Sequence, residues 1–250
     1  MEKNTTGLKI LKVKDPVDLI LKPFPEPLPN PYSSLLLILG SVKSGKSTIL
    51  SNLFLNSSFY GSGLPSDKKT GKQQTGADYF DKVMIISNSI LNDYTLRFMR
   101  DTFEFKSEYR DGDIKDIIKE QKKYGDRSKM PLMALIADDI LSTGFKKNNE
   151  LSFLASRFRH VNIFYIITSQ NMKSISPIIR SNATSVIITK QNDEDEYTKI
   201  SESWAPMFGG QTEFLRLYNE AINFEPYSFL YLKLDENPAH AWQSFNKRIK

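Results

Sequence analysis

The sequence predicts an α/β fold in which a mostly parallel β-sheet is covered by helices on both faces. Short, continuous apolar runs recur along the chain, and each has the length of one strand. Strands buried on both faces of a parallel sheet have this composition, because neither face meets water. The runs alternate with segments of helical periodicity, the order that joins parallel strands through crossover helices. The chain has 250 residues, 40% of them hydrophobic, which suffices for one such domain.

The predicted strands follow from these apolar runs. The first run ends at Gly40, the third closes on the pair Asp138-Asp139, and the fourth ends at Ser169-Gln170. A sixth, late run near the C-terminus predicts one further strand. The predicted strands span residues 35–39, 83–86, 132–137, 161–168, 185–189 and 229–234.

Helices are predicted between these strands. Behind the first strand, Ile49, Leu50, Leu53 and Phe54 recur with the spacing of one helical face. A long polar loop is predicted before the second strand, because residues 61–81 are rich in Gly, Ser, Lys and Gln. The predicted helices span residues 47–56, 93–103, 113–124, 150–158, 193–204 and 211–221, with a short helix before Arg180.

Residues 1–33 precede the first strand and predict an extended, proline-rich arm. Prolines stand at every second position from Pro23 to Pro31, and such spacing excludes a helix and favours extended backbone. We expect residues 34–250 to form a single domain. The polar N-terminus is unlike a signal peptide, and no apolar run approaches the roughly 18 residues that span a bilayer. We therefore expect a protein inside a cell, without a membrane span.

The composition excludes several kinds of site. The chain has no cysteine, which excludes disulfides and thiolate metal sites. Its two histidines, His160 and His240, are too few for a histidine zinc site. The formal net charge of +5 permits contact with a polyanion such as DNA, although a solvated basic surface accounts for the charge equally well.

Residues 40–47 match the phosphate-binding motif G-x-x-x-x-G-K-[ST] in full. The motif lies between a buried strand and an amphipathic helix, the context it requires. Its glycines let backbone N–H groups point at phosphate oxygens, and the following helix adds its positive end. We expect Lys46 to reach the β- and γ-phosphates of ATP and the Ser47 hydroxyl to ligate Mg²⁺. The expected nucleotide contacts are Gly40, Ser41, Val42, Lys43, Ser44, Gly45, Lys46, Ser47 and Thr48.

Two later strand ends carry candidate catalytic residues. Asp138 closes the third strand, where its carboxylate can hold Mg²⁺ together with Ser47. Asp139 follows and is the candidate that orients or deprotonates the attacking water. Gln170 ends the next strand, and if that strand lies between the other two its amide faces the γ-phosphate. An ordinary strand-end turn and a solvated glutamine are the alternatives for these residues.

Arginine and lysine residues outside these motifs are further candidates. Phosphoryl transfer often uses an arginine from a neighbouring subunit. We favour Arg180, then Arg159, over Arg157, with a surface role as the alternative for each. Phosphates of DNA require only mobile cations, so the candidate DNA contacts are Lys68, Lys69, Lys72, Lys146, Lys147 and the basic tail of residues 247–250.

The order of these motifs resembles the viral genome-packaging ATPases of the FtsK–HerA superfamily, the vaccinia-type enzymes of large DNA viruses, virophages and polinton-like elements. Residues 35–48, 134–139 and 159–170 carry the resemblance, which extends roughly from residue 35 to residue 189. The phosphate-binding loop is common to many families of P-loop proteins, whereas the aspartate pair and the Arg-His and Ser-Gln segments point to this family among them. One departure is Asp139, because many relatives in the wider superfamily have glutamate there.

The resemblance implies a P-loop NTPase fold of the ASCE, RecA-like type and an ATP-driven motor that moves double-stranded DNA into a preformed capsid. It implies that Lys46 and Ser47 hold nucleotide and Mg²⁺, that Asp138 and Asp139 serve metal and water, and that Gln170 senses the γ-phosphate. It further implies a homo-oligomeric ring of five or six subunits with an arginine acting across the interface, capsid or vertex proteins as partners, and a location at the virion assembly site of an infected cell or in the virion.

Two other functions are compatible with the same loop. A P-loop nucleoside or nucleotide kinase needs an acceptor site and often an arginine-rich lid, and no arginine cluster follows Gln170. The other is a nucleotide-gated DNA-binding protein that does not hydrolyse ATP. The presence of Lys46, Ser47, Asp138 and Asp139 argues against it, because no residue needed for hydrolysis is missing. A translocase unrelated to packaging would have the same residues, and only the family resemblance distinguishes it from a packaging ATPase.

Overall fold

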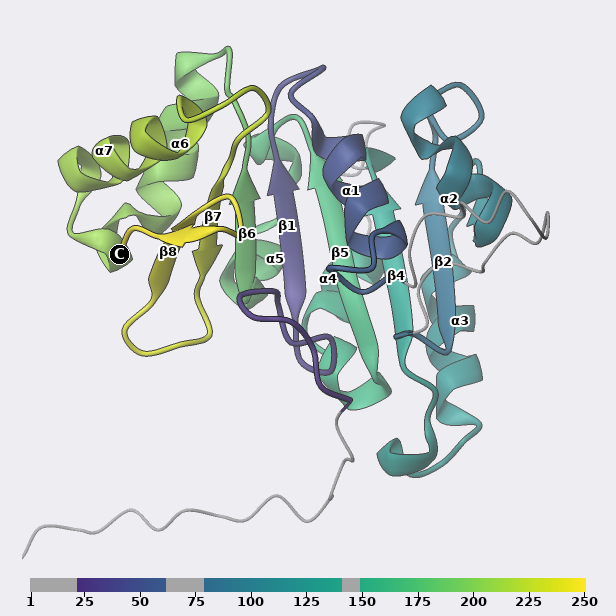
Figure 1. The fold of residues 1–250 in the computed structure, drawn as a ribbon. Helices are drawn as coiled ribbons and strands as arrows, with labels where there is room; N and C mark the ends of the chain where they lie inside the picture. Colours follow the sequence, from purple (N-terminus) through teal and green to yellow (C-terminus); the bar gives the residue numbers. More distant parts are fainter. Residues whose placement is uncertain (1–21, 62–78, 141–148) are drawn as a thin grey trace, which may run out of the picture.

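The computed structural model describes residues 22–61, 79–140 and 149–250, and its centre is a nine-stranded sheet with the order β3-β2-β4-β5-β1-β6-β7-β8-β9 (Figure 1). The first six strands are parallel: β1 (Leu35–Leu39), β2 (Lys82–Ser87), β3 (Glu104–Lys106), β4 (Met133–Asp138), β5 (Ile163–Ser169) and β6 (Ser185–Ile188). The last three pair antiparallel: β7 (Leu230–Lys233), β8 (His240–Gln243) and β9 (Lys247–Arg248). The predicted α/β architecture is confirmed.

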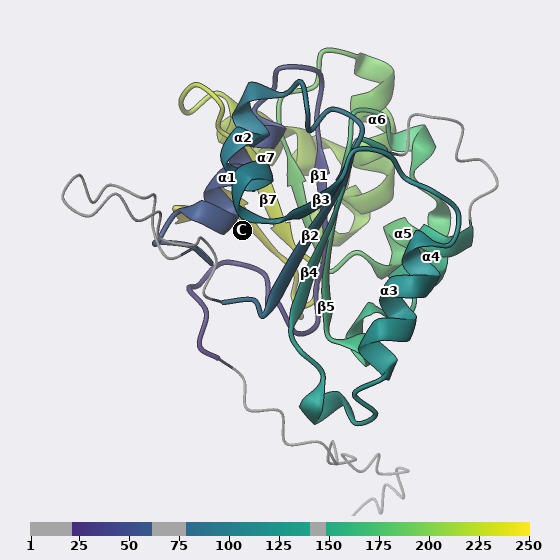
Figure 2. The same cartoon turned by 90° about the vertical axis from the view of Figure 1, so that its right-hand side faces the viewer.

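Helices cover both faces of the sheet, as Figure 2 shows in the view turned by 90°. One face carries α1 (Lys46–Leu55) and α2 (Arg97–Thr102). The other carries α3 (Asp113–Lys122), α4 (Asn149–Ala155), α5 (Pro177–Asn182), α6 (Glu194–Trp204) and α7 (Gln211–Ile222). Strand β1 separates two apolar cores, since Leu37 faces one and Ile38 the other. This two-sided burial explains the uniformly apolar composition of the central strands.

The strand order places β5 between β1 and β4. Leu39 at the end of β1 pairs in register with Ser169 of β5, and Asp138 at the end of β4 pairs with Thr168. Because all three strands are parallel, their carboxyl ends meet at one edge of the sheet. This edge is where open α/β sheets bind ligands.

Three short strands, β3, β8 and β9, are absent from the sequence prediction. The helix predicted over residues 93–103 is a 3₁₀ turn (Tyr94–Leu96) followed by α2, and β3 comes directly after it. The first two residues of the predicted basic tail, Lys247 and Arg248, form β9, which pairs with β8. These strands are two to four residues long, and the outermost two, β3 and β9, are largely exposed, so they lack the apolar runs that mark the central strands.

The described part of the predicted arm, residues 22–33, lies against the domain. Leu28 is fully buried, and the Tyr60 hydroxyl donates a hydrogen bond to the Pro29 carbonyl. Residues 1–21 lie outside the described residues, so the boundary between arm and domain stays a prediction. Among the described helices, none combines the length and apolar character needed to cross a bilayer.

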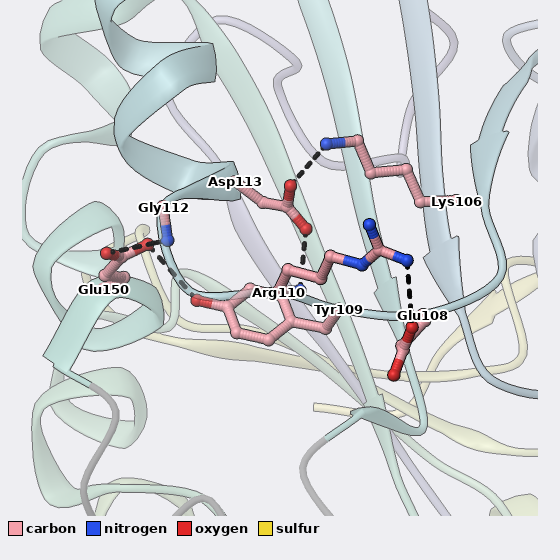
Figure 3. A network of polar contacts seen from close by, with 7 residues as sticks. All are labelled: Lys106, Glu108, Tyr109, Arg110, Gly112, Asp113 and Glu150. Carbon is pink, nitrogen blue, oxygen red and sulfur yellow. Dashed lines mark hydrogen bonds and ion pairs between the residues drawn. The ribbon is translucent and has the colours of Figure 1, made fainter.

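A polar network fixes the connection between β3 and α3 against the start of α4 (Figure 3). The Glu150 carboxylate accepts hydrogen bonds from the Gly112 amide at 3.1 and 3.2 Å and from the Tyr109 hydroxyl at 3.3 Å, and it pairs with Lys115 at 2.9 Å. Asp113 accepts from the Arg110 amide at 2.8 Å and pairs with Lys106. The network holds the first turns of α3 and α4 together beside the edge where the parallel strands end.

Candidate active site

A cleft of about 490 Å³ lies at the edge where β1, β4 and β5 end. Its lining brings together most of the residues that the sequence singles out, from three separate parts of the chain. The predicted residues that line it are Val42, Lys43, Ser44, Gly45, Lys46, Ser47, Thr48, Asp138, Asp139 and Gln170. Two residues of the predicted phosphate-binding loop, Gly40 and Ser41, do not line the cleft. They form the base of the loop beneath Lys46.

The loop after β1 is held by hydrogen bonds from both neighbouring strand ends. The Gly40 amide donates to the Ser169 carbonyl and the Ser41 amide to the Lys190 carbonyl, both at 3.2 Å. A Cβ added at Gly40 would lie 1.7 Å from the Thr189 hydroxyl oxygen, so no larger residue fits there. Gly45 has a φ of 99°, in the left-handed region that favours glycine. These constraints explain the two fixed glycines of the motif.

The N-terminus of α1 opens into the cleft without a cap of its own. No side chain caps it, and its first turn contains no acidic residue. The first amides of a helix lack partners within the helix, and their combined dipole favours an anion. The start of α1 therefore offers phosphate a set of N–H donors, as the sequence predicts.

The Lys46 ammonium group is folded back onto its own loop. It donates to the Gly40 carbonyl at 2.6 Å and to the Ser41 carbonyl at 2.9 Å. Burial lowers the pKa of Lys46, while the nearby carboxylates of Asp139 and Asp138 act in the opposite direction. A phosphate group entering the cleft can replace the two carbonyls as the partner of this cation.

Asp138 is held rigidly at the end of β4. Its side chain is buried, with a relative exposure of 4% for the residue, and it accepts hydrogen bonds from the Ser87 hydroxyl at 2.7 Å and the Thr168 hydroxyl at 2.6 Å. These hydroxyls come from the neighbouring strands β2 and β5. The orientation of the carboxylate is therefore fixed before any ligand arrives, which suits a metal-binding role.

Asp139 and Gln170 form a pair at the mouth of the cleft. The Gln170 amide donates to the Asp139 carboxylate at 2.7 Å, and the Asp139 amide donates to the Thr168 hydroxyl at 3.0 Å. Asp139 has a φ of 50°, a conformation that few non-glycine residues adopt and that often marks functional sites. Burial, and then the Asp138 charge, raise its pKa; Lys46 and Gln170 act against this. A half-buried carboxylate with a raised pKa is a better proton acceptor than an exposed one.

Two further residues of the cleft were not singled out by the sequence. The Ser47 hydroxyl donates to the Asp93 carboxylate at 2.7 Å, and the other oxygen of Asp93 accepts from the Thr95 amide at 2.8 Å. Tyr227, in the loop between α7 and β7, also lines the cleft, with its ring against Gly45. The sequence marks Asp93 only as the start of a predicted helix, although its place shortly after a buried strand is a signal for a site residue. Nothing in the sequence marks Tyr227.

The oxygen donors of the cleft suit Mg²⁺. Ser47, Asp93, Asp138 and Asp139 all line it, and Mg²⁺ prefers oxygen ligands. Among the residues that the structure describes, no group of three or more Asp, Glu or His side chains is close enough to hold a metal ion alone. An ion at this position would therefore share its ligands between the protein and the phosphates, which is the usual mode for Mg²⁺ with nucleotides.

The predicted arginines do not reach the cleft of their own chain. Arg159 lies in a 3₁₀ turn (Phe158–Val161) directly before β5, and Arg180 lies in the last turn of α5, just before β6. Both positions are at the edge where the parallel strands begin, opposite the cleft. The Arg159 guanidinium lies 5.2 Å from the ring centroid of Phe158. Their proposed action on a neighbouring subunit stays a prediction.

The predicted DNA contacts in the polar loops fall outside the described residues. This applies to the loop lysines at 68, 69, 72, 146 and 147, which lie in residues 62–78 and 141–148. The basic C-terminus is described, and Lys250 donates to the Phe208 carbonyl at 2.8 Å. The other three residues are engaged as well, since Lys247 and Arg248 pair with β8 and the Ile249 amide donates to the Ala241 carbonyl at 2.8 Å.

Solved structures with the same fold include a viral packaging enzyme. No family model matches the chain, and no curated protein sequence matches it significantly. The genome packaging NTPase B204 of Sulfolobus turreted icosahedral virus 2 in complex with ATP-γS has a TM-score of 0.52 and 14% identity, covering 86% of this chain and 98% of that chain. Its complex with AMP gives 0.54 and 14%, covering 84% and 96%.

The DNA-packaging ATPase B204 of Sulfolobus turreted icosahedral virus gives a TM-score of 0.51 and 15% identity, covering 84% of this chain and 96% of that chain. At such identities the likeness shows a shared fold. The predicted P-loop NTPase fold is thereby confirmed over most of both chains, in agreement with the resemblance that the sequence motifs indicate.

Proposed function

We propose that this chain is an ATPase that uses ATP and Mg²⁺ to move double-stranded DNA into a viral capsid. The observation that carries this proposal is that the candidate hydrolytic residues meet in one cleft at one sheet edge. Lys46 and the start of α1 face the same cleft as the fixed carboxylate of Asp138 and the paired side chains of Asp139 and Gln170.

ATP binding would use groups that the fold has already positioned. The loop amides and the first amides of α1 would donate hydrogen bonds to the phosphates. Lys46 would exchange its two backbone carbonyl partners for phosphate oxygens. Ser47 and Asp138 would hold Mg²⁺, which neutralises charge on the β- and γ-phosphates when bound. Asp93 accepts a hydrogen bond from the Ser47 hydroxyl, so the lone pairs of the serine oxygen would be free to face the ion.

Hydrolysis would proceed by attack of water in line with the γ-phosphorus. The water oxygen forms a bond to phosphorus, the bond to the bridging oxygen of ADP breaks, and Asp139 accepts the proton that the water loses. Gln170 would orient the water while its amide holds Asp139. The raised pKa of Asp139 supports the role of proton acceptor.

The ring and its DNA substrate are proposed on three grounds. The fold is shared with the genome-packaging B204 proteins, and the net charge of +5 suits a polyanion. Among the described residues, the lining of the cleft includes no arginine. A neighbouring subunit would supply one, with Arg180 and then Arg159 as candidates, in a homo-oligomeric ring of five or six copies. Capsid vertex proteins would be its partners in the infected cell.

The test is ATP hydrolysis by the purified chain with and without double-stranded DNA at low salt, beside Lys46→Ala and Asp139→Asn. DNA-stimulated turnover that both substitutions abolish supports the motor. An ATP hydrolysis rate that does not change with DNA contradicts the translocase proposal for the isolated chain. Phosphate transfer to a nucleoside would identify a kinase. ATP binding without any turnover would indicate a nucleotide-gated binding protein.

A further inference from the structure

A second, smaller cavity opens beside the phosphate-binding cleft. It has a volume of about 200 Å³ and a mostly apolar lining, whose aromatic members are Phe59, Tyr227, Phe229 and Phe245. Gly45, Thr48 and Tyr227 belong to the linings of both cavities. The two spaces are therefore contiguous, and they meet at the start of α1.

The aromatic wall of this cavity is built in advance. The ring of Phe245 packs edge-on against Phe229 and Tyr231, with centroids 5.0 Å apart in each case, and against Phe59 at 5.7 Å. Contacts of this kind hold an aromatic side chain in one orientation. The wall thus exists without a ligand.

Tyr227 is the exposed member of the set and the one that joins the two cavities. Its residue exposure is 71%, and its φ of 66° is unfavourable for a residue with a large side chain. Its ring lies against Gly45, where an added Cβ would lie 3.3 Å from the ring. An exposed aromatic residue in a strained conformation against the phosphate-binding loop indicates a role in binding.

The polarity of the two cavities sets the direction of a bound nucleotide. Asp139 and Gln170 mark the end of the cleft where the γ-phosphate reacts, and Tyr227 marks the side that adjoins the apolar cavity. A triphosphate along the loop therefore has its reactive end at Asp139. The rest of the nucleotide extends toward Tyr227.

We propose that the apolar cavity holds the purine base of the nucleotide, with the Tyr227 ring stacked on it. This inference rests on the proposed nucleotide-binding function. Besides Thr48, the polar side chain of the lining is Asn52, whose amide donates to the Thr48 carbonyl at 2.9 Å and accepts from Asn56 at 3.3 Å. Because most of the lining is apolar, we expect shape and stacking to dominate recognition of the base, and ATP and GTP to bind with similar affinity.

The test is calorimetric titration of the full chain, with Mg²⁺, by ATP, GTP and inorganic tripolyphosphate. Tripolyphosphate occupies only the phosphate cleft, so it separates base binding from phosphate binding. We expect Tyr227→Ala to weaken ATP and GTP about tenfold, the scale of one aromatic–base stack, and to leave tripolyphosphate unchanged. Tyr227→Phe keeps the ring and retains wild-type affinity. Tyr124→Ala, an exposed tyrosine just beyond the far end of α3, is the matched control and binds all three ligands normally.

The outcomes distinguish this inference from the function on which it rests. Unchanged ATP binding by Tyr227→Ala overturns the base site and leaves the phosphate site intact. A preference of wild type for ATP over GTP greater than about tenfold overturns recognition of the base by shape and stacking alone. Equal weakening of ATP and tripolyphosphate also overturns the base site, because the tyrosine would then support the loop. Lys46→Ala should lose both ligands, and a wild type that binds neither ligand overturns the proposed function as well.

Discussion

The cleft at the ends of β1, β4 and β5 and the polar network of Figure 3 contain carboxylates that are similarly placed but whose pKa values shift in opposite directions. Both lie at the edge where parallel strands end, and burial raises the pKa of Asp139 in one and acts in the same direction on Glu150 in the other. Hydrogen bonds from Lys115, Gly112 and Tyr109 outweigh that effect, so the pKa of Glu150 is lowered overall. For Asp139 the opposing groups are too weak, and its pKa is raised.

This difference in pKa is the one expected between a structural carboxylate and a carboxylate that takes part in catalysis. Glu150 has partners that satisfy its charge within the chain, so it stabilises the fold as an anion. Asp139 faces Asp138, and its partners leave it more basic than an ordinary aspartate. A site kept for an external ligand retains such unfavourable electrostatics until the ligand arrives.

The largest expected effect is the loss of turnover in Asp139→Asn. An asparagine cannot accept the proton of the attacking water, so we expect steady-state ATP hydrolysis to fall about 100- to 1,000-fold, within the range of general-base catalysis. Nucleotide binding, measured by titration, should persist. Glu150→Gln is the matched control and should hydrolyse ATP at the wild-type rate. An equal loss of ATP hydrolysis in both variants would contradict a catalytic role for Asp139 and a structural role for Glu150.

The next effect is on stability. Glu150→Gln removes a charged acceptor from three hydrogen bonds, and we expect the free energy of unfolding in urea to fall by about 2 kcal/mol at neutral pH. Because the folded pKa of Glu150 is lowered, its stabilisation is present above the ordinary value of 4.5 and is lost as pH falls through the folded pKa. The difference between variant and wild type should therefore shrink in acid.

The matched control for this stability change is Glu108→Gln. Glu108 pairs with Arg110 at 3.3 Å in the same network, but both side chains are exposed. An exposed pair contributes between about 0 and 1 kcal/mol. A loss as large for Glu108→Gln as for Glu150→Gln would show that burial does not set the value of these contacts.

Asp93→Ala should have an intermediate effect, on Mg²⁺ affinity. The variant loses the acceptor that orients the Ser47 hydroxyl, and removal of such a supporting group costs about tenfold or more in metal affinity. The measurement is a Mg²⁺ titration of nucleotide binding by calorimetry, with ATP in the absence of Mg²⁺ as the reference. If the Mg²⁺ dependence of nucleotide binding is unchanged in the variant, Asp93 serves only to cap the following 3₁₀ turn.

The central strands could be predicted from sequence because they are buried on both faces. β1 is apolar throughout, β4 and β5 are apolar apart from their last residues, and all three strands are buried along their length. The strands β3 and β9 could not be predicted, since they are short edge strands with polar composition that depend on a neighbour for their geometry.

The candidate site divides along the same line. The phosphate-binding loop and Asp138, Asp139 and Gln170 could be predicted because they directly follow buried strands, so local sequence sets their position. Tyr227 lies in a loop 182 residues beyond Gly45 and approaches it only through the antiparallel return of β7. Asp93 likewise reaches Ser47 through tertiary packing. No local pattern specifies either contact.

The smallest expected effect is a gain of stability in Asp139→Asn, the variant that loses turnover. A raised folded pKa means that the fold disfavours the charged form, so wild type is destabilised above that pKa and the penalty disappears below the ordinary value of 3.8. Removing the charge should raise the free energy of unfolding at neutral pH by roughly 1 kcal/mol or less, since the group is only half-buried. Urea unfolding across pH measures this, and the gain should vanish in acid. A loss of stability at neutral pH would instead place Asp139 with Glu150, as a carboxylate whose charge the fold needs.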